Sequence, residues 1–329
     1  MSTSAQSHHR FAFAMPVIHA SLVTLLLFLF TWPAATAEPR DVPLGVVGPA
    51  PATDQIFSML EMRQPGAFDV TVYASPDEAT EAVQNREIYG AIVVGKAIEV
   101  QIASAANPAV AQLITSLGDT LMAGSLAQQG VQVPTLTVSE LAALPDDDAR
   151  GMVLGSASLP VVIGGIALGA LVSLRVRGAW TQLSVVGTSA LLSGSALAWG
   201  MGPGLGALSG DYWTNAITLA AILGAFGFPL VAAHRLAGLG GLGLVAATFF
   251  LLGNPLSGIS IPPEFYPSVW GQIGQLMPLG AGFDLLKSLN FFESASTQAP
   301  LWVLGTWILV ALALWFIPTR KGRETLTAA

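Results

Sequence analysis

The side chains able to do covalent or metal chemistry are few in this chain. It has no cysteine, four histidines, 13 basic and 20 acidic residues among 329. Without cysteine there is no thiolate nucleophile, disulfide or thiolate metal site. No two histidines lie four residues apart, so none form a metal-binding pair on a helix face. The sequence therefore predicts no catalytic, cofactor or metal site, and we expect a protein that is not an enzyme.

One cluster, Asp146-Asp147-Asp148, has the composition of a cation site. Carboxylates are the ligands that hard cations prefer. However, the triplet lacks the ligand spacing and the glycine turn of a calcium loop. We therefore favour a solvated linker over a metal site.

The composition is that of a membrane protein. Apolar residues make up 53% of the chain and charged residues 10%, whereas soluble proteins carry about 25% charged residues. The net charge is −7, so no broad basic face exists to neutralise the phosphates of a nucleic acid. These figures exclude a soluble enzyme and a nucleic-acid-binding protein.

The apolar residues gather in six blocks of the length that an α-helix needs to cross a bilayer. A backbone in lipid must satisfy its own hydrogen bonds, so we expect helices. The first block precedes Ala35-Thr36-Ala37, which resembles a signal-peptide cleavage site. We favour a retained anchor over a cleaved signal peptide, because the block is longer than a usual signal sequence. The six blocks are residues 11–32, 152–174, 180–201, 213–233, 236–252 and 301–317.

The basic residues predict the orientation, because short cytoplasmic loops are enriched in Lys and Arg. Arg175 and Arg177 lie between the second and third blocks, and Arg235 lies between the fourth and fifth. The loop at 202–212 contains no basic residue, and Lys287 is the only basic residue in the loop at 254–300. Both termini are then cytoplasmic and residues 38–150 lie outside. Three further basic residues follow the sixth block, namely Arg320, Lys321 and Arg323.

Residues 38–150 have the pattern of a small α/β domain. They hold 15 acidic and 5 basic residues, as expected of a solvated segment. Strand patterns alternate with helix patterns, which indicates a sheet covered by helices. We therefore divide the chain into residues 1–37 (cytoplasmic tail and first helix), 38–150 (α/β domain) and 151–329 (five further membrane helices). The predicted strands are 44–47, 68–73, 89–94 and 98–103, and the predicted helices are 53–63, one opening at Ser75, and 107–129.

The loop at 254–300 is long and apolar, and long loops in compact domains are usually functional. Aromatic and aliphatic residues from Phe265 to Met277 are spaced like one helix face, and a second amphipathic pattern covers 279–292. We expect a re-entrant or interfacial hairpin packed at the outer leaflet, with an interfacial aromatic belt as the alternative. The candidate gate residues are Asn254, Pro255, Pro262, Pro263, Phe265, Tyr266, Trp270, Pro278 and Gly280.

The order of these parts resembles the ABC-2 type transporter permeases, in particular the YhgE/Pip-like branch. The likeness runs from about residue 15 to 320 and includes five stretches. These are Ser75-Pro-Asp-Glu-Ala-Thr-Glu-Ala-Val, Arg86-Glu-Ile-Tyr-Gly-Ala-Ile-Val-Val, Asn254-Pro-Leu-Ser-Gly, Pro262-Pro-Glu-Phe-Tyr-Pro and Leu276-Met-Pro-Leu-Gly-Ala-Gly.

The resemblance implies a permease subunit of an exporter in a bacterial plasma membrane. In the family, two six-span subunits form a homo- or heterodimer, a separate ATPase binds from the cytoplasm, and the outer hairpin caps the path. The chain has no phosphate-binding G-x-x-x-x-G-K-[ST] loop, so a partner must hydrolyse ATP. The cargo implied is a hydrophobic or lipid-like molecule.

Two features bear on this interpretation. The spans carry no acidic or basic residue, whereas ion-coupled carriers keep intramembrane charges. The loop between the second and third spans is too short for the family's coupling helix. Arg175 and Arg177 are then either an ATPase-docking site or positive-inside anchors, and we favour anchors. The alternative function is a membrane-anchored surface receptor or secretion-accessory protein that acts through residues 38–150.

Overall fold

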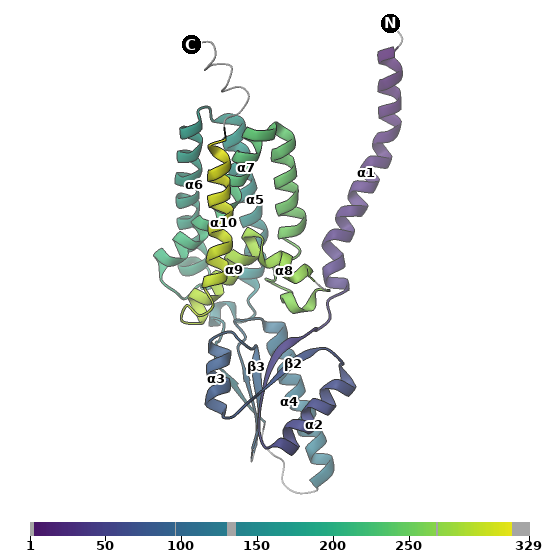
Figure 1. The fold of residues 1–329 in the computed structure, drawn as a ribbon, viewed down its shortest axis with the longest axis vertical. Coiled ribbons are helices and arrows are strands. Elements are labelled where there is room, and N and C mark those ends of the chain that lie inside the picture. The colour runs from purple at the N-terminus through teal and green to yellow at the C-terminus, as the bar shows by residue number, and fades with distance from the viewer. Residues whose placement is uncertain (1–2, 96, 130–135, 268, 318–329) are drawn as a thin grey trace.

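The computed structural model describes residues 3–95, 97–129, 136–267 and 269–317. The chain is mostly helical, with one small mixed sheet. Figure 1 shows a long N-terminal helix, an α/β domain and a helical bundle, with the bundle stacked on the α/β domain. The basic residues at 320, 321 and 323 lie outside the described ranges.

The α/β domain has a five-stranded sheet of order β2-β1-β3-β4-β5. β1 pairs in parallel with β2 and β3, β4 runs antiparallel to β3, and β5 runs parallel to β4. The strands are β1 (Val42–Val47), β2 (Phe68–Tyr73), β3 (Gly90–Val94), β4 (Ile98–Ile102) and β5 (Leu136–Glu140). The helices are α2 (Ala50–Arg63), α3 (Pro76–Gln84) and α4 (Pro108–Gln129).

Helices cover both faces of this sheet. Ile56 and Leu60 of α2 share one buried apolar cluster with Val110 and Ile114 of α4 and with β1, β3 and β4. Ala79 and its neighbours in α3 lie in a second cluster, on the opposite face. The strand at 68–73 is confirmed with its bounds. β5 is not among the predicted strands, because its five residues contain no apolar run.

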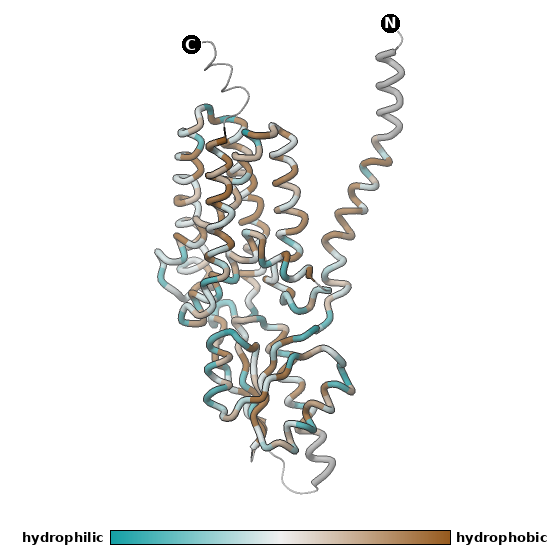
Figure 2. The backbone as a smooth tube through the Cα atoms, viewed as in Figure 1, coloured by the Kyte–Doolittle hydropathy of each residue, from teal (hydrophilic) through white to brown (hydrophobic). Residues whose placement is uncertain are grey.

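Among the residues that the structure describes, five helices are long and apolar enough to cross a membrane, which is compatible with a multi-pass membrane protein. Figure 2 shows hydrophobic residues along α1 and the bundle, and more hydrophilic ones over the α/β domain. The five elements are α1 (Thr3–Ala35, apolar from Met15), α5 (Met152–Arg175), α6 (Ala179–Trp199, extended by η2 at Gly200–Gly204), α7 (Tyr212–Thr248, extended by η3 at Phe249–Gly253) and α10 (Gln298–Trp315).

The long element α7 folds back on itself at Gly238, whose φ of 62° and ψ of −147° break the helix. The rings of Phe226 and Phe249 lie 5.0 Å apart. In a straight helix, 23 residues would separate them by about 34 Å. Figure 1 shows the two halves of α7 side by side. The blocks at 213–233 and 236–252 are therefore two halves of one helical hairpin. The sequence places the loop between them at Arg235, and the chain reverses three residues later, at Gly238.

The bundle packs around the first half of α7. Its main core joins buried residues of α5, α6, α7, α10 and the short α9 (Pro278–Phe291). The close approach of α6 to α7 depends on a glycine, because a Cβ at Gly194 would lie 2.5 Å from the backbone nitrogen of Ala220. Large apolar side chains such as Leu192, Leu171 and Leu309 remain exposed on the outside of the bundle.

The hairpin region differs from the expected helix face at 265–277. It contains η4 (Pro263–Phe265), a bend, the six-residue helix α8 (Trp270–Gln275) and then α9. Pro267 lies within that interval, and proline removes a backbone donor and restricts the residue before it. The second pattern, at 279–292, corresponds to α9.

Candidate functional site

The short helix α9 is buried although it is too short to cross a membrane. It begins at Pro278, and ten of its fourteen residues are buried. Gly282 approaches Ile222 of α7 so closely that a Cβ there would overlap the Ile222 side chain. At its far end, Phe292 is 4% exposed and belongs to the apolar cluster of α3 and the sheet. The α9 segment thus belongs to the cores of both the bundle and the α/β domain.

An ion pair joins α9 to the α/β domain beside this apolar contact. Arg86 follows α3 and lies 2.5 Å, Nη2 to Oδ1, from Asp284 of α9. Its other terminal nitrogen donates to the Asp284 carbonyl oxygen at 3.2 Å and to the Ser288 hydroxyl. The guanidinium also lies over the Phe292 ring, 5.2 Å from its centroid. Arg86 therefore fixes the position of α9 through charge, hydrogen bonds and ring contact together.

Lys287 is the second charged residue of α9 that faces the α/β domain. Its side chain is buried, and Nζ donates to the carbonyl oxygen of Ala106 at 2.9 Å. Burial, together with the nearby Arg86, lowers the pKa of Lys287 to about 8, although Asp284 and Glu264 act in the opposite direction. The amine is therefore still mostly protonated at neutral pH.

The segment before α8 also contacts the α/β domain. The Tyr89 hydroxyl donates to Glu264 Oε2 at 2.8 Å. Burial and the Glu264 carboxylate raise the pKa of Tyr89 well above its ordinary value. The backbone of residues 264–265 also accepts hydrogen bonds from the amides of Arg40 (3.1 Å) and Glu38 (3.2 Å).

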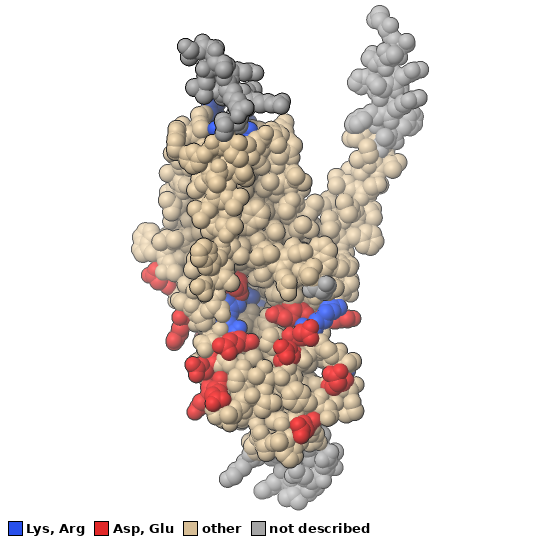
Figure 3. All heavy atoms as spheres, viewed as in Figure 1, with Lys and Arg blue, Asp and Glu red and all other residues tan. Residues whose placement is uncertain are grey.

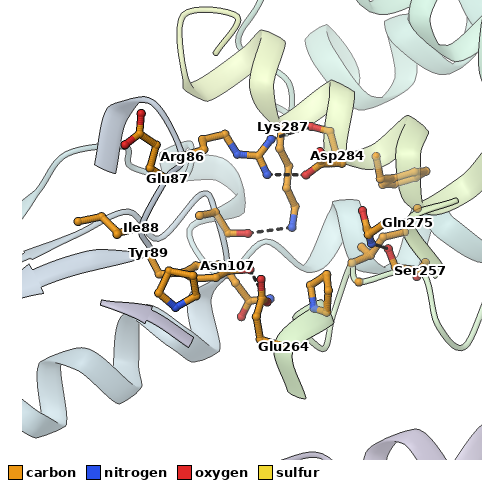
Figure 4. A pocket seen from close by; sticks show the side chains of 17 residues that line it. Arg86, Glu87, Ile88, Tyr89, Asn107, Ser257, Glu264, Gln275, Asp284 and Lys287 are labelled. Atoms are coloured by element: carbon orange, nitrogen blue, oxygen red, sulfur yellow. Dashed lines mark hydrogen bonds and ion pairs between the residues drawn. The ribbon is translucent and has the colours of Figure 1, made fainter. Parts of the chain in front are cut away.

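These contacts surround a cavity of about 260 Å³ between the α/β domain and the bundle (Figure 4). Figure 4 shows the Lys287 side chain extending from α9 toward Asn107 and Glu264. Asn107 is 1% exposed; its Oδ1 accepts from the amides of Ala109 (3.0 Å) and Val110 (3.3 Å) at the start of α4. Its Nδ2 is buried and has no hydrogen-bond partner among the described residues. The polar lining is Arg86, Glu87, Tyr89, Asn107, Ser257, Glu264, Gln275, Asp284 and Lys287.

Five of the nine predicted gate residues separate into three groups. Pro263 and Gly280 line the cavity. Phe265 packs against the core of the α/β domain. Pro255 and Trp270 line an apolar groove of about 200 Å³ against α1, where the Trp270 and Trp32 rings lie 5.8 Å apart.

The remaining four gate residues shape the backbone. The Tyr266 hydroxyl donates to the Pro255 carbonyl oxygen at 2.9 Å. Pro262 precedes η4, Pro278 starts α9, and the Asn254 carbonyl oxygen accepts from Ser257 at 3.4 Å. The structure therefore does not bring the nine residues together into one site.

Sequence reasoning missed the polar residues of the cavity, namely Arg86, Tyr89, Asn107, Asp284 and Lys287. They come from segments almost 200 residues apart, which no short motif connects. One signal was present: Lys287 is the only basic residue in the apolar loop 254–300. A lone cation in such a segment indicates a specific partner.

Asp146 and Asp147 of the acidic triplet are exposed, whereas the expected solvated linker is wrong for Asp148. This side chain is buried, and its carboxylate accepts from the amides of Met152 (2.7 Å) and Val153 (3.1 Å), which caps α5. A capping carboxylate satisfies amides that have no partner within the helix. Within the described ranges, no three His, Asp or Glu residues are grouped to hold a metal ion.

Arg175 and Arg177 are exposed at the end of the bundle away from the α/β domain. In the part of the chain that the structure describes, neither forms an ion pair. Nearby, the Arg235 guanidinium lies 4.9 Å from the centroid of the Trp315 ring. In the view of Figure 3, Lys and Arg appear at this end and again at the junction with the α/β domain, Asp and Glu are scattered over the α/β domain and the junction, and the bundle between shows no charge.

Comparison with protein-family models, with curated proteins and with solved structures finds no match to this chain.

Proposed function

We propose that this chain is the membrane permease subunit of an ABC-2-like exporter in a bacterial plasma membrane. Its cargo is a hydrophobic or lipid-like molecule, and a separate ATP-binding subunit supplies the energy. The observation that supports this most is the position of α9 in both cores, with Phe292 in the α/β domain and Phe283 in the bundle. Through α9, a movement of the membrane helices reaches the outer surface.

In this proposal the chain crosses the membrane six times, with both of its ends in the cytoplasm. The two halves of α7, joined at Gly238, cross in opposite directions. Arg175, Arg177 and Arg235 then lie on the cytoplasmic side, as the enrichment of basic residues in cytoplasmic loops requires. The α/β domain lies outside the cell.

The proposal also includes a second permease subunit, identical or not. The apolar window of α1 has no buried residue, and exposed Leu and Trp side chains cover the outside of α5, α6 and α10. Lipid and a partner subunit share these surfaces. No nucleic acid is expected, since the exposed charge on the α/β domain is mainly acidic.

Affinity purification of the tagged full-length chain from its native membrane tests the proposal. We expect an ATP-binding subunit to co-purify in a stoichiometric amount. If none does, and if deletion of residues 38–150 removes the only phenotype of the chain, the protein is a surface receptor or secretion-accessory protein instead.

A further inference from the structure

The cavity between the α/β domain and α9 holds two hydrogen-bond donors that the protein leaves incompletely used. Lys287 is 7% exposed, and of its three N–H groups the bond to the Ala106 oxygen engages one. Asn107 is 1% exposed, and its Nδ2 has no partner. A buried donor without a partner lowers the stability of the fold. Both residues line the cavity. An oxyanion beside Lys287 would engage its remaining N–H groups, and a small side-chain adjustment would bring the Asn107 amide, whose Nδ2 has almost no accessible area here, to the same anion.

The same cavity also holds an acceptor of opposite charge. Glu264 accepts from the Tyr89 hydroxyl through Oε2. In the described part of the chain, neither Glu264 nor Lys287 takes part in an ion pair within 4.0 Å. Both nevertheless lie close enough for the carboxylate to raise the pKa of the amine. The ammonium and the carboxylate thus face the same space without touching.

Charge balance favours a ligand that carries both signs. Arg86 is already neutralised by Asp284, and Glu87 is exposed, with its carboxylate turned away from Lys287 in Figure 4. The charges that face a ligand are therefore the Lys287 ammonium and the Glu264 carboxylate. An isolated anion would leave Glu264 opposed to it, and an isolated cation would leave Lys287 opposed to it. A volume of about 260 Å³ equals that of about nine liquid waters at about 30 Å³ each. The cavity therefore takes a small molecule or a small headgroup.

We infer that this cavity binds a small zwitterion, with an oxyanion held by Lys287 and Asn107 and an ammonium group held by Glu264. Phosphoethanolamine has this pair of groups and about this size, either as the headgroup of a phospholipid, whose phosphodiester carries one negative charge, or as a free molecule, whose phosphate monoester carries nearly two. The site lies at the junction of the α/β domain with the bundle, so the ligand would connect the two. The inference holds whether the chain exports a substrate or acts as a receptor.

Calorimetric titration of the purified full-length chain with phosphoethanolamine tests the site. We expect binding at least about tenfold tighter than that of inorganic phosphate or ethylamine, because each of these supplies one of the two charges. Lys287→Met and Glu264→Gln should each weaken binding about tenfold or more. Glu264→Gln keeps an oxygen for the Tyr89 hydroxyl, so it retains the fold, which the thermal midpoint verifies. Glu61→Gln and Arg63→Met, exposed on α2, are the controls and should bind as the parent does.

A second titration distinguishes the two sources of the zwitterion. If the headgroup is the ligand, nanodiscs containing phosphatidylethanolamine raise the thermal midpoint of the parent and not that of Glu264→Gln. If the free molecule is the ligand, soluble phosphoethanolamine does so in nanodiscs without that lipid. The inference is overturned if neither source binds, if inorganic phosphate binds as tightly as phosphoethanolamine, or if Lys287→Met leaves the affinity unchanged.

Discussion

At the residue scale, the junction between the α/β domain and the bundle depends on a few charged side chains in a buried setting. Arg86 and Asp284 pair directly, whereas among the described residues the Lys287 ammonium donates only to a carbonyl oxygen. A buried ammonium without a carboxylate partner costs stability, and this cost appears as the lowered pKa of Lys287. The charged form of Lys287 therefore opposes folding and the neutral form does not.

This cost predicts how stability depends on pH. Between about pH 8 and the ordinary lysine pKa of about 10.4, the unfolded chain keeps a proton that folded Lys287 has lost, so stability rises with pH. The gain from about pH 7.5 to about pH 9 is on the order of 1 kcal/mol. Above about pH 10 the raised pKa of Tyr89 makes stability fall as the pH rises, because the folded protein keeps a proton that the unfolded chain loses. The effect of Lys287 is therefore measured below that pH.

The measurement is the thermal midpoint of the parent and of Lys287→Met in detergent over that pH range. The parent midpoint should rise relative to that of Lys287→Met, and Arg63→Met, exposed on α2, should follow the parent. Equal pH profiles for the parent and Lys287→Met would show that Lys287 is not buried in its charged form.

At the element scale, the short helices α8 and α9 depend on glycine for their close approach to neighbouring backbone. A Cβ at Gly274 would overlap the carbonyl group of Leu256. Because this neighbour is backbone and cannot rotate away, α8 would have to move, and Trp307 would lose the hydrogen bond that it donates to the Leu276 oxygen at 2.9 Å.

Gly274→Ala should therefore destabilise the protein by about 1–3 kcal/mol, the usual cost of overpacking. The matched control is Gly187→Ala in α6, where an added Cβ meets nothing within 4 Å. Alanine favours a helix over glycine, so this control should be neutral or slightly stabilising. Thermal melting of both variants in detergent measures the difference, and equal midpoints would contradict the packing described for α8.

The sequence predicts elements well where one physical pattern dominates. The run of residues 68–73 alternates in polarity and forms β2, and the long apolar blocks form the membrane-length helices. It does not predict the cavity, because Arg86 and Asp284 are polar residues on separate elements and no spacing relates them. Nor does it predict that Phe292 enters the core of the α/β domain, since an aromatic residue at a loop end equally suits a membrane interface.

At the scale of the whole molecule, the six-crossing arrangement is open to direct labelling, because the chain has no cysteine of its own. Asp54→Cys in α2 and Ser209→Cys between α6 and α7 should react with a membrane-impermeant maleimide in intact cells. Arg177→Cys and Ala237→Cys should react only after the membrane is permeabilised. All four positions are exposed, so burial would not explain a difference in labelling between them.

Ala237→Cys is the informative position, since it lies beside the turn at Gly238. Labelling of this variant in intact cells would mean that the tip of α7 lies outside, and that its two halves do not cross the membrane as proposed.

The central claim, that this chain works as an export permease driven by a separate ATPase, is tested most directly by the rate of ATP hydrolysis in liposomes. The measurement compares the co-purifying ATP-binding subunit alone with the same subunit reconstituted together with this chain. We predict hydrolysis several-fold faster when the chain is present. An unchanged rate, with the chain folded and inserted in the expected orientation, would contradict the proposed function.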